Sequence, residues 1–248
     1  MAKMGNSTYR TRHAAPKFVP VGKKESKWYV RTSPGPHSAS RSIPLGSVLR
    51  DSLKVASTMT EARKLIAAGA VLVDGRAIKD YKFPIGLMDI ISFPSAGQHY
   101  RVVPDPIKYL KLIPISGEEA RFKYVRVIGK VMTNKSMIQI NLEDGRNIRT
   151  SMEKYRTELQ VDTFTTLKLN LEDGSVITKF ELKEGSYAVA VAGRNVGLHG
   201  RISEIRTSPF KSKRDSLVTV ESSNKDSFQT RVINIMAIGG KSPDVRLD

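Results

Sequence analysis

The sequence contains no cysteine, and this absence excludes disulfide bonds, thiolate metal sites and cysteine nucleophiles together. The four histidines are widely separated and lack the spacing of metal ligands; they are His13, His37, His99 and His199. We therefore expect a protein that uses no metal and no other cofactor.

Long apolar runs are also missing. No stretch approaches the ~18–20 apolar residues that a membrane-spanning helix needs. The first ten residues, MAKMGNSTYR, lack the apolar segment of a cleaved signal peptide. The absence of cysteine fits a reducing compartment. We expect a soluble, cytoplasmic protein with no membrane partner.

Acidic residues are scarce relative to basic ones. The 248 residues include 41 Lys and Arg against 24 Asp and Glu, a formal net charge of +17 with a pI near 10.0. Such a surplus repels itself unless a polyanion neutralises it, and a pI above about 9 is typical of nucleic-acid binders. An apolar fraction of 40% is enough to form cores. At roughly 150 residues per domain, two or three small domains are expected.

The positive charge is concentrated at the start of the chain. Residues 1–42 carry +8, whereas residues 43–103, 104–180 and 181–248 carry +3 each. The first segment is rich in proline and glycine and lacks helical or strand periodicity over most of its length. It is interpreted as an extended arm that has little structure alone and orders on a polyanion. The alternative is a solvated terminus, although the Trp28-Tyr-Val30 cluster indicates that the arm docks on something.

Residues 43–93 are predicted to form two helices followed by strands. The first helix is expected to start at a Ser42 cap, with Pro44 near its first turn and an apolar stripe at Leu45, Val48, Leu49 and Leu53. Thr58 and Glu61 have the spacing of a capping box for the second helix, and Gly69 suits a left-handed stop. Asp74-Gly75 predicts a tight turn between strands at 71–73 and 88–93.

The remainder of the chain is predicted to be β-structure. Residues 104–180 contain strands such as 137–142 and 166–171. They also contain a repeated Asn-Leu-Glu-Asp-Gly, at 141–145 and 170–174, which we interpret as two hairpin turns.

Residues 185–240 begin with the buried-type strand 187–191, which leads into a glycine-rich loop. The glycines there permit a tight loop and a close approach to a partner. Further strands are expected at 217–220 and 230–235. Residues 241–248 are interpreted as a tail.

No catalytic constellation is recognisable. The glycine loop from Gly193 lacks the spacing and the Lys-Ser/Thr of a phosphate-binding loop, and it leads into a strand instead of a helix. A Gly-x-Ser-x-Gly elbow does not occur. Glu118 and Glu119 are interpreted as acids at a helix start. We therefore expect no enzyme and no small-molecule substrate.

The order of these features resembles one protein family. It combines a basic arm with SPGPH at 33–37, a two-helix module with TEARKLIAAGAVLVDG at 60–75, a β domain, and VAGRNVGLHGRI at 191–202. This order resembles the ribosomal protein S-four-e family, in its archaeal-like form, over nearly the whole chain. Residues 186–205 look like a KOW motif, a short β unit with a central glycine that ribosomal and transcription-elongation proteins share. The loop differs from the usual motif, since Val196 precedes Gly197 where a lysine is common.

The resemblance implies an α+β multidomain protein with a definite layout. It implies a basic extended N-terminal arm over 1–42 and a small α/β RNA-binding domain of the S-four type over 43–103. A central β-barrel-like domain over 104–180 and a C-terminal SH3-like KOW β-barrel over 181–240 would follow, with a tail at 241–248.

The resemblance also implies a function. The protein would be a structural constituent of the small ribosomal subunit, ribosome-bound in the cytoplasm, with small-subunit rRNA and neighbouring small-subunit ribosomal proteins as partners. Phosphate contacts made by Lys and Arg release counterions and supply salt-sensitive affinity. The candidate RNA-binding residues are Arg10, Arg12, Lys17, Lys23, Lys24, Arg31, Arg41, Arg50, Arg63, Lys64, Arg76, Lys79, Lys82, Arg194, Asn195 and Arg201.

Three alternatives remain open at this point. A pseudouridine synthase needs an Asp nucleophile, often in Gly-Arg-Leu-Asp, whereas Gly75-Arg76 is followed by Ala77 and Asp80 is displaced. A non-ribosomal RNA chaperone or transcription-associated factor would also use the KOW unit. A peripheral membrane protein held by the arm is the weakest alternative, because no apolar interfacial helix accompanies the charge.

Overall fold

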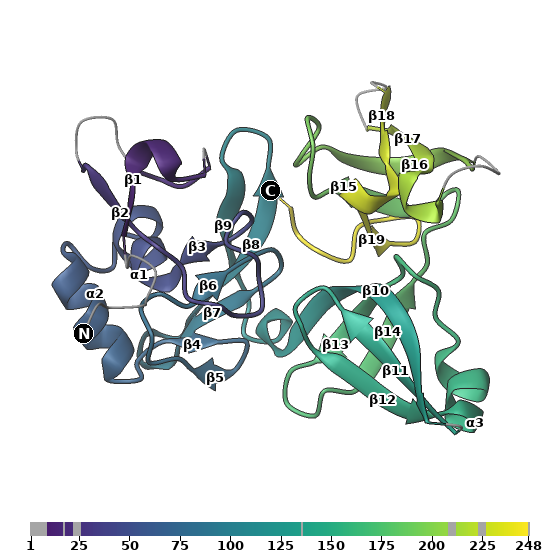
Figure 1. Ribbon diagram of the computed structural model, residues 1–248, viewed down its shortest axis with the longest axis horizontal. Helices are drawn as coiled ribbons and strands as arrows, with labels where there is room; N and C mark the ends of the chain where they lie inside the picture. Colours follow the sequence, from purple (N-terminus) through teal and green to yellow (C-terminus); the bar gives the residue numbers. More distant parts are fainter. Residues whose placement is uncertain are drawn as a thin grey trace, which may run out of the picture. The chain divides into compact units, whose positions relative to one another are not determined.

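The computed structural model describes residues 9–16, 18–21, 26–134, 136–207, 212–222 and 227–247. They form two compact units (Figure 1). Unit 1 extends to Val102 and includes Pro114–Ala120, and unit 2 contains Val103–Ile113 and the chain from Arg121 onward. The strands β8 (Gln98–Asp105) and β9 (Tyr109–Ile115) therefore run through both units.

The first five-stranded sheet has the order β5-β4-β7-β8-β9; its strands β5, β4 and β7 lie in unit 1, and β8 and β9 run through both units. Its short strands are β4 (Leu72–Val73), β5 (Arg76–Ala77) and β7 (Ile90–Phe93). The expected turn is present, with positive φ at both Asp74 and Gly75, but it joins β4 to β5 and not to the strand expected at 88–93. The expected strand 88–93 begins at Ile90 instead, because Met88 has a φ of 60° and cannot continue an extended strand.

Two helical segments pack beside this sheet. The first is α1 (Leu45–Ser47), which widens directly into the π-helical turn η2 (Val48–Ser52), where the Leu53 amide donates to the Val48 carbonyl. The predicted apolar residues Leu45, Val48 and Leu49 are buried. The second is α2 (Met59–Ala67), whose predicted capping box between Thr58 and Glu61 is confirmed.

The predicted Ser42 cap is wrong. The Ser42 hydroxyl donates to the Ser38 carbonyl at 2.8 Å, so it points back into the preceding loop. Between Ser42 and the helix lies β3 (Ile43–Pro44), which pairs with β6 (Pro84–Ile85), and Pro44 takes the cap position. A strand pairing over long sequence separation was invisible to the local pattern.

The described part of the basic arm is folded, which corrects the expectation of little structure. β1 (Tyr9–Thr11) pairs antiparallel with β2 (Trp28–Val30), and the short turn η1 (Arg12–Ala14) follows β1. Tyr29 and Val30 are buried, which confirms that the cluster docks, and it docks within the chain itself.

Two further contacts hold the arm on unit 1. His37 Nε2 lies 2.9 Å from Asp89 Oδ1, and the Ser33 hydroxyl donates to Asp80 at 2.8 Å. Both partners lie beyond α2, so the arm and the following module form a single structure. The arm's proline and glycine content therefore reflects an irregular path over a surface and not a lack of structure.

The first sheet of unit 2 has the order β12-β11-β10-β13-β14. Its strands are β10 (Phe122–Asn134), β11 (Met137–Leu142), β12 (Asn147–Ser151), β13 (Thr166–Asn170) and β14 (Val176–Phe180). Both repeated Asn-Leu-Glu-Asp-Gly segments form the predicted hairpin turns. The segment is not all β, because α3 (Met152–Lys154) and the π-helical turn η5 (Tyr155–Leu159) follow β12.

The second sheet of unit 2 has the order β18-β17-β16-β15-β19. It contains β15 (Tyr187–Ala190), β16 (His199–Arg206), β17 (Leu217–Glu221), β18 (Ser227–Arg231) and β19 (Ile235–Gly239). The strand expected at 230–235 is wrong, since the 3₁₀ turn η7 (Val232–Asn234) divides that stretch between two strands. A second such turn, η6 (Lys213–Asp215), precedes β17.

The predicted tail at 241–248 is packed over its described residues. Val245 is buried, and the Asp244 carboxylate accepts hydrogen bonds from Tyr124 at 2.7 Å and Lys168 at 2.8 Å. The Asp244 carboxylate thus has its partners on the first sheet of unit 2, far away in the sequence, where a local pattern could not indicate them.

Candidate nucleic-acid interface

The centre of the candidate interface in unit 1 is an arginine that stacks on one tyrosine and donates hydrogen bonds to two. Arg63 of α2 lies with its guanidinium carbon 4.1 Å from the centroid of the Tyr81 ring. Its Nη2 donates to the hydroxyls of both Tyr9 and Tyr81, each at 3.0 Å. This contact joins the arm, α2 and the loop after β5. Arg63, one of the candidate RNA-binding residues, is therefore half-buried and engaged in contacts within unit 1.

The two phenols differ in their electrostatic surroundings. The hydrogen bond from Arg63 lowers the pKa of Tyr9, since it favours the phenolate. Burial raises the pKa of Tyr81, more than the charge of Arg63 lowers it. The contact combines a cationic group with aromatic rings.

Four further candidate cations lie on α2, on β5 and in the loop after β5. Lys64 follows Arg63 on α2 and is exposed, as are Arg76 of β5 and Lys79 beyond it, while Lys82 is half-buried with its Nζ 5.5 Å from the Tyr81 ring centroid. Among the described residues, Lys64, Arg76 and Lys79 form no ion pair with a carboxylate. Cations without internal partners are available to phosphates.

The candidate residues of the arm have mixed surroundings. Arg41 is exposed, and Arg10, Arg12 and Arg31 are half-buried. Arg50 of η2 is already paired with the neighbouring Asp51, with Nε 2.6 Å from Oδ1, so part of its charge is neutralised within the chain. The remaining arm candidates lie outside the described residues, namely Lys17, Lys23 and Lys24.

Three further candidates lie in unit 2, two in the glycine-rich loop and Arg201 on β16. Arg194 is exposed, whereas Asn195 donates to the Gln229 carbonyl at 3.2 Å. The Arg201 guanidinium donates to the Lys241 carbonyl at 3.0 Å. Arg194 is therefore the candidate in this loop with the least internal engagement.

The glycines of this loop serve the chain's own packing. Gly197 has a φ of +83°, and a Cβ there would overlap Pro106, while a Cβ at Gly200 would overlap the Glu221 carbonyl. The close approach that we expected toward a partner is thus made to neighbouring segments of unit 2.

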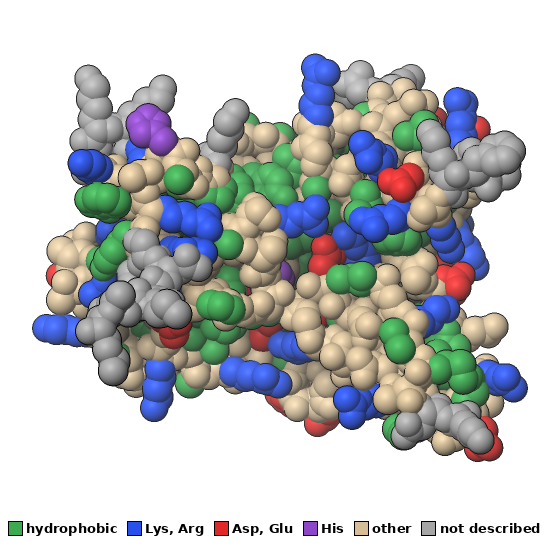
Figure 2. Space-filling view, in the orientation of Figure 1, with side chains coloured by type: hydrophobic (Ala, Val, Ile, Leu, Met, Phe, Trp, Pro, Cys, Tyr) green, Lys and Arg blue, Asp and Glu red, His purple; other side chains and the backbone are tan. Residues whose placement is uncertain are grey.

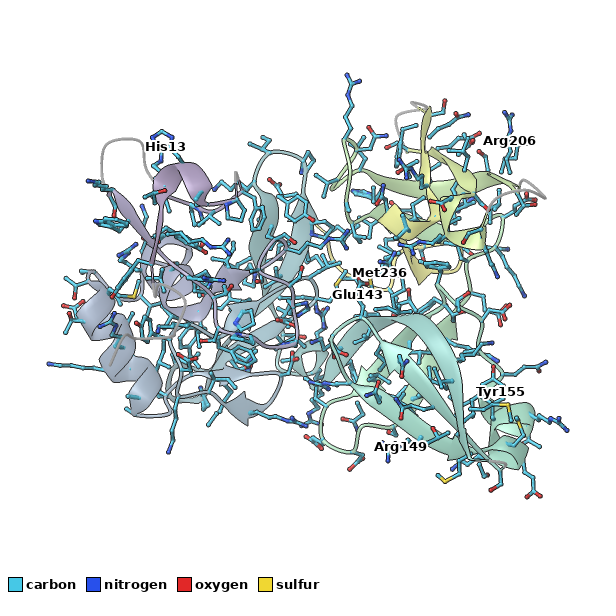
Figure 3. All side chains as sticks on the ribbon, viewed as in Figure 1. His13, Glu143, Arg149, Tyr155, Arg206 and Met236 are labelled. Atoms are coloured by element: carbon cyan, nitrogen blue, oxygen red, sulfur yellow. The ribbon has the colours of Figure 1, made fainter. Side chains whose placement is uncertain are left out.

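Several basic residues are buried and cannot contact a ligand. Arg126 of β10 is bonded to both Glu143 oxygens and also donates to the carbonyls of Ile233 and Ile235. Figure 3 labels Glu143 on this cluster. Lys123 is equally buried, with Nζ 3.4 Å from Asp144. Net charge alone therefore overstates the cationic surface.

The sequence reasoning missed the aromatic part of the interface. Tyr9, Trp28 and Tyr81 lie beside the basic residues, and Trp28 is 54% exposed. Their adjacency to Arg and Lys in the sequence was the available signal. In the view of Figure 2, Lys and Arg side chains recur over the visible surface and acidic side chains are fewer.

Neither a metal cluster nor a membrane-spanning element is found in the described part of the chain. Those residues contain no group of three or more His, Asp or Glu side chains placed to hold a metal ion. They also include no helix long and apolar enough to cross a membrane.

Comparison with known proteins places this geometry in context. The model of the ribosomal family S4e matches residues 96–176, the S4 domain model matches residues 45–91, and the RS4NT (NUC023) domain model matches residues 4–40.

Curated relatives match almost the full chain. A small ribosomal subunit protein eS4 from Sulfurisphaera tokodaii is 48% identical, with 94% of this chain and 96% of the relative covered. The protein of the same name from Sulfolobus acidocaldarius is 45% identical over 96% of this chain and 97% of its own length.

A solved structure is also similar. The crystal structure of the 30S ribosomal protein S4e from Thermoplasma acidophilum matches with a TM-score of 0.66 at 28% identity. The match covers 81% of this chain and 96% of that one.

These findings define the class of this protein: it is a ribosomal protein that carries an RNA-binding S4 domain, and it is not an enzyme. The chain belongs to the ribosomal family S4e. The resemblance inferred from the sequence is confirmed. The S4 match also covers α1, η2, α2 and the β4–β5 hairpin, which are the elements that carry Arg63, Lys64 and Arg76.

Proposed function

We propose that this protein is a structural constituent of the small ribosomal subunit, where it binds small-subunit rRNA and supports its folding and assembly. The observation that carries the proposal is the set of unpaired, exposed cations on the S4 domain, Lys64, Arg76 and Lys79. Folded rRNA presents dense phosphate, and each phosphate neutralised by Lys or Arg adds salt-sensitive affinity.

The geometry suits recognition of RNA shape and backbone. Lys64 lies on α2, which the Arg63–Tyr81 stack joins to the loop after β5, where Lys79 lies. A rigid cationic surface of this kind contacts phosphates and 2′-hydroxyls without reading the deep major groove of an A-form helix. The proposed RNA-binding residues are those that the sequence singled out. Arg63 and Arg201 also make hydrogen bonds within the chain and would help to position the other residues.

The finer layout is part of the same proposal. The arm over 1–42, the S4-type domain over 43–103, the β domain over 104–180 and the KOW-type barrel over 181–240 would each touch rRNA. Support for the KOW assignment comes from the loop between β15 and β16, where Gly193 and Gly197 have positive φ and Arg194 is exposed. Neighbouring small-subunit proteins are proposed as further partners, with the ribosome-bound protein in the cytoplasm.

Sedimentation tests the proposal directly. A native lysate is separated on a sucrose gradient, and each fraction is probed for this protein and for the small-subunit rRNA. We expect one copy per small subunit, retained at moderate salt. Protein that stays with free proteins at the top, or that follows only immature particles, would contradict the structural role and favour an assembly or modification factor.

A further inference from the structure

Trp28 occupies an unusual position for a large apolar side chain. It is the only tryptophan of the chain and opens β2, yet 54% of it is exposed, while the next two residues, Tyr29 and Val30, are buried. The strand therefore uses its other residues to dock on unit 1 and leaves the indole outside. An exposed tryptophan on a docked strand calls for a functional explanation.

The backbone on both sides of Trp28 is held in place. Thr11 of β1 is its partner across the β1–β2 ladder, and the Arg12 amide donates to the Lys27 carbonyl at 3.1 Å. The Ser26 hydroxyl donates to the Trp28 carbonyl at 2.7 Å. The backbone that bears the indole is thus held by the β1–β2 pairing. The turn η1 follows β1, and Figure 3 labels its residue His13. A fixed aromatic ring loses little conformational entropy when it binds a planar partner.

The charges around the indole are all positive among the described neighbours in the two strands and the turn. Lys27 Nζ lies 5.6 Å from the centroid of the Trp28 ring, and Arg12 follows Thr11, the residue that pairs with Trp28 across the ladder. Arg10 pairs with Tyr29 and therefore lies on the other face of the β1–β2 ribbon. Neither Lys27 nor Arg12 forms an ion pair within the described residues. An apolar protein surface would have to desolvate them, whereas an anionic chain with planar groups would neutralise them.

We propose that Trp28 is a nucleobase-stacking contact, on which one unpaired base of the bound RNA rests while Lys27 and Arg12 neutralise the flanking phosphates. This inference rests on the proposed rRNA binding and adds the kind of RNA element recognised. Bases in an A-form duplex are already stacked, so the target is a single-stranded loop, bulge or end. Every base has a flat face, so the contact tolerates different sequences.

The single tryptophan makes the proposal directly measurable. Excitation at the red edge of the absorption band, where tyrosine does not absorb, reports Trp28 alone in the full-length protein. The protein is titrated with small-subunit rRNA, with single-stranded oligouridylate and with inorganic polyphosphate at one fixed salt concentration. Polyphosphate supplies the same charge without bases. We expect saturable quenching by the two RNAs and little change with polyphosphate, because stacking on a base quenches indole emission.

Equal quenching by polyphosphate and RNA would overturn the proposal, since charge alone would then explain the signal. A filter assay on the same samples separates the two hypotheses. If rRNA is retained on the filter while the emission is unchanged, the stacking contact is wrong and the proposed function stands. If no rRNA is retained, the proposed function itself fails. Quenching that appears only after small-subunit proteins are added would assign Trp28 to a protein partner instead.

Substitutions supply the affinity test. Trp28→Ala is expected to weaken oligouridylate binding by about 5- to 150-fold, the range for loss of one stacked base. Trp28→Phe, which retains a ring, is expected to recover most of that loss, and Trp28→Leu is not. Ile107→Ala removes another exposed apolar side chain, 93% accessible in the β8–β9 turn, and is the matched control without effect. Equal affinities for the Ala and Phe variants would also contradict stacking.

Discussion

Arg63 and Tyr81 form a stacked pair, with the guanidinium 4.1 Å from the ring centroid. Because of this contact, Arg63 and its neighbour Lys64 have different surroundings. Arg63 points along the α2 surface toward the two tyrosines, while Lys64 is exposed. Adjacent residues on one helix face different directions. Arg63 therefore positions segments of unit 1, and Lys64 stays exposed, as the proposed phosphate contact requires.

The first prediction tests this division. Lys64→Ala is expected to lower rRNA affinity and to reduce the slope of log affinity against log salt by about 0.7–0.9, the loss of one phosphate contact. Arg63→Ala is expected to lower the free energy of unfolding by about 1–2 kcal/mol, since a stacked cation–π contact and two hydrogen bonds disappear. Filter binding across a salt series and urea unfolding measure the two effects. Lys111→Ala, another exposed lysine, controls for loss of charge alone. Identical salt slopes for the Lys64 variant and wild type would move the phosphate contact elsewhere.

The second prediction concerns the buried Arg126. Its guanidinium is bonded to Glu143 and to the carbonyls of Ile233 and Ile235, so Arg126→Met leaves several buried acceptors unpaired. We expect a loss of about 3–5 kcal/mol in the free energy of unfolding. Urea unfolding followed by circular dichroism gives the value. Arg206→Met, which removes an exposed ion pair with Glu204, is expected to leave the midpoint unchanged. Equal unfolding midpoints for both variants would show that the buried cluster around Arg126 adds nothing to the free energy of unfolding.

The third prediction concerns pH and Tyr29. Burial is the largest cause that raises the pKa of this phenol. The folded state therefore holds the phenolic proton more tightly than the unfolded chain. This contribution to stability is complete below about pH 10 and falls as the pH rises above that value, where the unfolded phenol ionises first. Melting temperatures of Tyr29→Phe are expected to fall less than those of wild type above pH 10.

At neutral pH the same variant makes a second test. The Tyr29 hydroxyl is buried without a hydrogen-bond partner in the described structure, so Tyr29→Phe is expected to be neutral or slightly stabilising. Tyr187→Phe is the matched control, because its hydroxyl lies 2.7 Å from His199 Nδ1, and it is expected to lose about 1 kcal/mol. A larger loss at Tyr29 than at Tyr187 would mean that the buried hydroxyl has a partner.

The fourth prediction compares two glycines with the same backbone conformation. Gly197 and Gly69 have φ values of +83° and +75°, but a Cβ at Gly197 would overlap Pro106, whereas the space around Gly69 is open. Both alanine substitutions strain the backbone, and Gly197→Ala should cost about 1–3 kcal/mol more because of the overlap. Thermal melts of the two variants make the comparison. Equal melting temperatures would show that the Pro106 segment yields without cost.

Local patterns in the sequence were reliable where a few adjacent residues decide the conformation. The capping box of Thr58 and Glu61 and the turn at Asp74-Gly75 were predicted and are present. Each depends on a side chain or a positive φ that acts within about four residues. The Ser42 cap failed for the complementary reason, since the pairing of Ile43 with Ile85 spans a long stretch of chain and overrides the local preference.

The candidate interface shows the same division. The basic residues were identifiable as a set, because charge composition can be read directly from the chain. Which of them are available could not be read, because Arg63 looks like Lys64 until Tyr81 is placed beside it. The arm likewise looked unstructured until Tyr29 was seen to be buried and His37 to lie beside Asp89.

The sequence by itself determined the family, the excess of positive charge and the succession of helices, hairpins and glycine loop, because these depend on composition and on short-range order. Only the tertiary structure decided which cations are buried or paired, why the tail is packed through Asp244 and Val245, and why Trp28 is exposed among cations. Those outcomes depend on distances between residues far apart in the chain. Electrostatic pairing and desolvation act through space, so neighbours in three dimensions, and not neighbours in sequence, assign each charged and aromatic side chain its role.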